Sequence, residues 1–110
     1  MSVSAPFSPS GNTVTFTATT SAPTPVQAIS NTLGGNQYRV INSGNVLVFL
    51  GFGTTSAQAS NGAVAVTSTG NAIPLLAGTD EILTFTPNAY FTGVSGGSTA
   101  VVYITPGDGS

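Results

Sequence analysis

The chain has 110 residues, of which only 4% are charged, and its formal net charge is −2. It contains no cysteine, histidine or tryptophan, so disulfide scaffolds, zinc sites of the Cys and His type and thiol nucleophiles are excluded. With one basic residue in the whole sequence, no basic patch for nucleic acid or anionic lipid can form. Hydrophobic residues make up 40%, which is enough for one folded domain with an ordinary core.

A surface with so few charges must be hydrated by Ser, Thr, Asn and Gln, or else be covered by partners. We favour coverage, because every charge buried at an interface costs desolvation free energy and this chain has few to bury. Residues 1–6 contain neither a basic region nor an apolar run, so no secretory signal is predicted. The longest apolar stretch, residues 46–52, is far shorter than the ~20 residues of a membrane helix. We therefore expect a soluble protein made without export.

Alternating apolar and polar residues, interrupted by Gly, Pro and Asn, predict strands along the whole chain, and helix formers are scarce. The first strand, residues 13–19, is the clearest, with Val14, Phe16 and Ala18 on one face and threonines on the other. Further strands are expected at residues 26–29, 37–42, 46–52, 63–67, 73–76, 81–86, 89–94 and 99–105. The loop at residues 42–45 contains Asn and Gly, which tolerate positive φ, and it predicts a hairpin between its two flanking strands.

About eight short strands at intervals of roughly 8–12 residues predict an all-β fold, an antiparallel β-sandwich. Strand order is left open: jelly-roll and immunoglobulin-like sandwiches both fit the pattern, and so does a small barrel. We expect a flexible N-terminal arm at residues 1–12, a single sandwich domain at residues 13–105 and a flexible tail at residues 106–110. Gly51 and Gly53 indicate a bulge or a close approach of another backbone segment.

The carboxylates of the sequence do not form a catalytic arrangement. Asp80 and Glu81 are adjacent and point to opposite faces of a strand, while Asp108 lies in a glycine-rich tail. A Ser or Thr nucleophile needs a neighbouring base, and the chain has neither His nor Lys. The glycine-rich stretches lack the lysine and the following helix of a phosphate loop. We therefore predict that the protein is not an enzyme and has no cofactor and no metal site.

Binding through surface contacts is the remaining kind of function, and six side chains are candidates for a partner interface. They are Phe7, Tyr38, Arg39, Phe52, Tyr90 and Phe91. Arg39 is the only cation, so we expect an acidic partner, either Asp80 or Glu81 of the same chain or a carboxylate across a subunit boundary. Tyr90 and Phe91 are adjacent, so one fills the core while the other is exposed or packs against a partner. The arm phenylalanine stands between two prolines and can anchor to a neighbouring subunit or pack on its own domain.

Three stretches of the sequence carry a resemblance to a known group of proteins. They are QYRVIN at residues 37–42, followed by Gly44 and Val48-Phe49, then IPLLAGTDEILT at residues 73–84, and VYITPGDG at residues 102–109. In these stretches the chain resembles small all-β virion proteins of tailed bacteriophages, of the type that decorates or cements capsids.

The resemblance implies a structural role on the exterior of the capsid, after synthesis in the host cytoplasm. The protein would bind the lattice of the major capsid protein and stabilise the head. Self-association is also expected, with a trimer favoured because a small ring presents one patch to several neighbours. The alternatives are a tail, neck or fibre component, or a small carbohydrate-binding sandwich module. Neither nucleic acid nor a membrane is expected as a partner.

Overall fold

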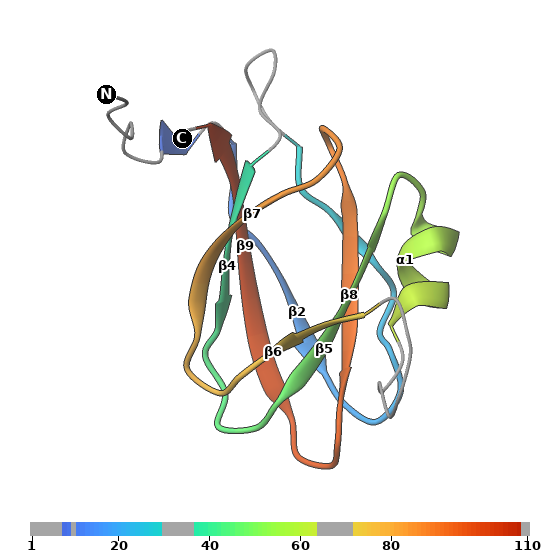
Figure 1. The fold of residues 1–110 in the computed structure, drawn as a ribbon. Helices are drawn as coiled ribbons and strands as arrows, with labels where there is room; N and C mark the ends of the chain where they lie inside the picture. The colour runs from blue at the N-terminus through green and yellow to red at the C-terminus, as the bar shows by residue number, and fades with distance from the viewer. Residues whose placement is uncertain (1–7, 10, 30–36, 64–71, 109–110) are drawn as a thin grey trace.

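The computed structural model describes residues 8–9, 11–29, 37–63 and 72–108, which form nine strands and one short helix (Figure 1). In chain order these are β1 (Ser8–Pro9), β2 (Val14–Ala18), β3 (Val26–Gln27), β4 (Gln37–Asn42), β5 (Val48–Gly53), α1 (Ser56–Gly62), β6 (Ile73–Leu75), β7 (Asp80–Thr84), β8 (Tyr90–Ser95) and β9 (Ala100–Asp108). The predicted all-β class is confirmed. In this part of the chain no helix is long and apolar enough to cross a membrane.

The strands form two antiparallel sheets that pack face to face. The first has the order β1-β9-β4-β7, with β2 also paired to β9, and the second has the order β3-β8-β5-β6. The pairing is nested: β5 pairs with β6, β4 with β7, β3 with β8, and β2 with β9. A long antiparallel ribbon folded over on itself in this way is a jelly roll, so the structure distinguishes between the two sandwich types that fit the sequence.

The hairpin predicted around residues 42–45 is wrong. β4 belongs to the first sheet and β5 to the second, so the chain crosses between the sheets at this point. The side chain of Asn42 is buried, and its Nδ2 lies 2.9 Å, 3.0 Å and 3.2 Å from the carbonyl oxygens of Val46, Leu75 and Leu76. Asn42 therefore ties this crossing to the connection that follows β6, instead of ending a two-stranded turn.

Described residues of two predicted flexible segments belong to the first sheet: Ser8–Pro9 of the arm, residues 1–12, and 106–108 of the tail, residues 106–110. β1 pairs with the end of β9, where Ser8 lies opposite Asp108. β9 itself runs to Asp108, beyond the predicted domain boundary at residue 105. Strands of the first sheet therefore include described residues on both sides of the domain predicted at residues 13–105.

Helix α1 lies on the outer side of the second sheet, and the sequence analysis did not predict it (Figure 1). Thr55 caps its N-terminus, since the threonine hydroxyl accepts a hydrogen bond of 3.2 Å from the backbone N–H of Gln58. Gly51 of β5 makes room for the helix, because a Cβ at this position would lie 2.3 Å from the carbonyl oxygen of Ala59. The close backbone approach predicted from this glycine is confirmed. The strand predicted at residues 63–67 falls, apart from its first residue, outside the described residues.

The core lies between the two sheets and consists of alternate residues of their strands. Its buried members are Phe16, Ala18, Ala28, Tyr38, Val40, Val48, Leu50, Leu75, Ala89, Phe91, Ala100, Val102 and Ile104. The Tyr38 ring lies 5.0 Å from that of Phe91 and 5.9 Å from that of Phe85. Its hydroxyl donates to the carbonyl oxygen of Thr86 at 2.5 Å and accepts from the N–H of Ala89 at 3.1 Å. These two hydrogen bonds fix the connection between β7 and β8 to the core. Burial raises the pKa of the Tyr38 hydroxyl.

Candidate functional site

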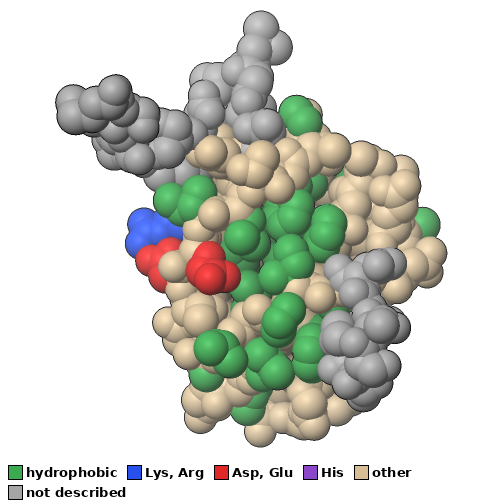
Figure 2. All heavy atoms as spheres, viewed as in Figure 1, with side chains coloured by type: hydrophobic (Ala, Val, Ile, Leu, Met, Phe, Trp, Pro, Cys, Tyr) green, Lys and Arg blue, Asp and Glu red, His purple; other side chains and the backbone are tan. Residues whose placement is uncertain are grey.

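The side of the first sheet that points away from the core forms a broad surface, which we call the outer face. Alternation along the strands and their register place on it Thr13, Thr15, Thr17, Gln37, Arg39, Ile41, Asp80, Ile82, Thr84, Val101, Tyr103 and Thr105. Ile82 and Tyr103 are 51% and 42% exposed, which is high for large apolar side chains. In the view of Figure 2 the basic and acidic side chains lie together at one side of the molecule. The outer face thus combines hydroxyl groups, exposed apolar side chains and one pair of opposite charges.

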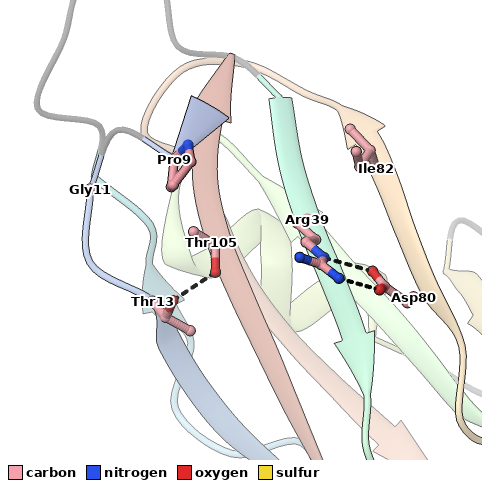
Figure 3. A pocket seen from close by; sticks show the side chains of 7 residues that line it. All are labelled: Pro9, Gly11, Thr13, Arg39, Asp80, Ile82 and Thr105. Atoms are coloured by element: carbon pink, nitrogen blue, oxygen red, sulfur yellow. Dashed lines mark hydrogen bonds and ion pairs between the residues drawn. The ribbon is translucent and has the colours of Figure 1, made fainter. Parts of the chain in front are cut away.

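Arg39 and Asp80 form an ion pair between the adjacent strands β4 and β7 (Figure 3). Arg39 Nε lies 2.9 Å from Asp80 Oδ1 and Arg39 Nη2 lies 2.5 Å from Asp80 Oδ2, so the guanidinium binds both carboxylate oxygens. The acidic partner expected for Arg39 is therefore a residue of the same chain. The hydrogen bond from Arg39 lowers the pKa of the Asp80 carboxyl, and the same bond raises the pKa of the Arg39 guanidinium.

We expect the Arg39–Asp80 pair to make a small and pH-dependent contribution to stability. Because the pKa of Asp80 is lower in the folded chain than in the unfolded chain, this contribution is present at neutral pH and disappears as the pH falls through the folded pKa. The two side chains are 49% and 44% exposed, so water and salt screen the interaction. The difference in urea midpoint between the wild type and Asp80→Asn should shrink from neutral to strongly acidic pH. A difference that does not change with pH would contradict this assignment.

An open groove of about 690 Å³ lies beside the ion pair on the outer face (Figure 3). It is lined by Pro9, Gly11, Thr13, Arg39, Asp80, Ile82 and Thr105. The hydroxyl oxygens of Thr13 and Thr105 lie 2.6 Å apart and share a hydrogen bond. Asp80 is a poor proton acceptor, because both of its carboxylate oxygens are held by Arg39 and its pKa is lowered. Asp80 is therefore poorly placed to act as a general base in this groove.

Two of the predicted interface residues, Tyr38 and Phe91, belong to the core, and Phe91 is thus the member of the adjacent pair Tyr90-Phe91 that fills it. Both are 0% exposed, and their rings meet edge to face. Tyr38 can be buried because its hydroxyl has two backbone partners. Phe91 points between the sheets, and Tyr90 therefore points to the opposite side of β8, where it is half-buried.

The other predicted interface residues do not lie together either. Arg39 is exposed on the outer face, whereas Phe52 is half-buried in the second sheet and stacks on the partly buried Phe85 at a centroid distance of 4.5 Å. Phe7 lies outside the described residues. The exposure of Ile82 and Tyr103 was not predicted from the sequence. Tyr103 has an apolar neighbour on each side, and Ile82 has an acid before it and a leucine after it. Alternation alone therefore does not show which of these side chains faces outward.

Comparison with known proteins adds no relative. No protein family model, no curated protein and no solved structure matches this chain. The functional interpretation therefore depends on the chemistry and geometry of the outer face.

Proposed function

We propose that this chain is a structural protein of the bacteriophage virion, a decoration or cement protein that binds the major capsid protein through its outer face and stabilises the head. The observation that carries the proposal is the composition of that face, which presents Thr, Ile, Val and Tyr and two charges that compensate each other. Burial of Ile82 and Tyr103 against a partner is favourable, and the Arg39–Asp80 pair costs less to desolvate than two unpaired charges would.

The resemblance to phage virion proteins also supports the outer face as the contact surface. The three stretches that carry it are far apart in the sequence, but they contain β4, β7 and most of β9. In the first sheet β4 lies between β9 and β7, so these stretches are side by side and supply most of the outer face.

The two alternative functions make different use of the same surface. A tail, neck or fibre component would also assemble through a charge-poor face, but it would be present in few copies per particle. A carbohydrate-binding module stacks sugar rings on exposed aromatic side chains, and the groove residues named above include none. The groove therefore offers no aromatic platform for a sugar ring, and Tyr103, beyond the groove lining, is the exposed aromatic residue named on the outer face.

The test is the copy number of the chain in purified particles, measured by quantitative peptide mass spectrometry against the most abundant shell protein. We expect a ratio near one or a simple fraction of it. Tyr103→Lys places an unpaired charge on β9, between β2 and β4, and should reduce the bound copies at least about tenfold, because that charge must be desolvated on attachment.

The matched control is Ala57→Lys, which adds the same charge at an exposed position of α1, on the outer side of the other sheet. This variant should be retained on particles like the wild type. A handful of copies per particle would assign the chain to the tail or neck. Its absence from particles, or equal retention of Tyr103→Lys and Ala57→Lys, would overturn the proposed role of the outer face.

A further inference from the structure

The two sheets have four outer edges, and three of them are protected in the part of the chain that the structure describes. Edge strands expose backbone N–H and C=O groups that can pair with another chain unless the strand is short, interrupted or covered. β3 has only two residues, and β6 contains Pro74, which has no N–H to donate. The edge at β2 turns onto the second sheet, where Thr19 forms a bridge with Val94.

The fourth edge, at β7, is neither short, interrupted nor covered within the described residues, and the two acids Asp80 and Glu81 are the protection that it carries. The strand is five residues long, contains no proline or glycine, and pairs within the described ranges only with β4. Ile82 at its centre is 51% exposed, and Leu83 and Phe85 are only partly buried against the core. Figure 2 shows hydrophobic side chains gathered beside the charged ones on this side of the molecule. An additional strand at this edge would gain backbone hydrogen bonds and cover apolar surface.

We propose that β7 is a self-association edge, at which two copies of the chain pair their β7 strands antiparallel about a twofold axis through Ile82. In this register Asp80 lies opposite Thr84 of the second copy, and Glu81 lies opposite Leu83 of the second copy. No like charges face each other, whereas a parallel pairing would set each acid beside its own equivalent. The sequence DEILT is therefore compatible with its own reverse, as a twofold contact requires.

The charge balance of the edge also fits a second copy. Arg39 compensates Asp80, so Glu81 is the one uncompensated charge on β7. Two identical edges can therefore approach with little repulsion. A strongly basic partner strand would gain little, because Glu81 alone would be available to pair with its charges. An isologous contact of this kind closes at two copies, unlike the trimer expected from the resemblance. The inference goes beyond the proposed function, because contact between copies requires no shell.

The test is the molar mass of the full chain, measured by sedimentation equilibrium over a rising concentration series. The wild type is expected to pass from the 10.9 kDa of one chain to twice that mass. Ile82→Lys should raise the dimer dissociation constant at least about tenfold, because two lysines would lie directly opposite each other. Thr17→Lys is the matched control, since Thr17 is exposed on the same outer face but on β2, at the protected edge. It should dimerise like the wild type.

A charge-pairing experiment identifies the residue on the axis. Ile82→Glu alone should be as monomeric as Ile82→Lys, and an equimolar mixture of the two should recover the dimer, because opposite charges then face each other. Thermal unfolding of each variant verifies that it is folded. The proposal is overturned if the wild type stays at the mass of one chain, if Ile82→Lys and Thr17→Lys behave alike, or if the mixture stays monomeric. Absence of the wild-type chain from particles, while the chain still dimerises, would contradict only the proposed function.

Discussion

Asn42→Asp is expected to lower the free energy of unfolding by about 3–5 kcal/mol, because it places an uncompensated carboxylate in the interior. The Asn42 side chain is fully buried, and its amide group donates to the carbonyl oxygens of Val46, Leu75 and Leu76. An ionised carboxylate has no hydrogen to donate and would face these three acceptors with a negative charge. Since domains of this size are stable by about 5–15 kcal/mol, the loss is a large part of the total.

The same substitution should introduce a characteristic pH dependence. Burial raises the pKa of the new carboxyl in the folded state above its value in the unfolded state, so the folded variant holds a proton that the unfolded chain releases. The stability of Asn42→Asp should therefore increase as the pH is lowered from neutral, relative to the wild type. Urea unfolding followed by circular dichroism measures both effects. Asn45→Asp, at an exposed position of the same loop, is the control, and equal midpoints for the two variants would contradict the role of Asn42.

Phe91→Ala is expected to lower the free energy of unfolding of the isolated chain by about 3–5 kcal/mol. The ring is fully buried between the sheets, with centroids 5.0 Å from Tyr38 and 5.4 Å from Phe85, so its removal leaves a cavity in the aromatic part of the core. Tyr90→Ala, one residue earlier and on the other side of β8, should cost clearly less. Urea unfolding of both variants makes the comparison. If Phe91 instead served a partner, its truncation would leave the isolated chain as stable as the wild type.

The positions of the strands could be predicted because alternation is a local property of the sequence. β4 covers residues 37–42 as predicted, and β2 lies within the predicted residues 13–19. Pairing could not be predicted in the same way, because chain order does not show whether consecutive strands share a sheet. The loop at residues 42–45 has the composition of a hairpin, yet two of the three acceptors of Asn42 are Leu75 and Leu76, at the end of β6 and directly after it, about thirty residues later.

Helix α1 and the buried aromatic residues depend on tertiary contacts that the sequence does not display. The helix has seven residues without a charged side chain, and it is held by the Thr55 cap and by the space above Gly51. Tyr38 is buried because segments distant in the sequence supply ring contacts and two backbone partners for its hydroxyl. Of the residues predicted to contact a partner, Arg39 could be placed at the surface by its charge alone.

The nested pairing also determines when this chain can fold during its synthesis. β9 is made after every other described strand, yet it lies between β4 on one side and β1 and β2 on the other. Until β9 has left the ribosome, β2 has no neighbour in its sheet, and its apolar side chains Val14, Phe16 and Ala18 lack the strand that completes their surroundings. The first sheet can therefore form only after β9 has been made. Translation that stops before β9 yields a product with no native sandwich.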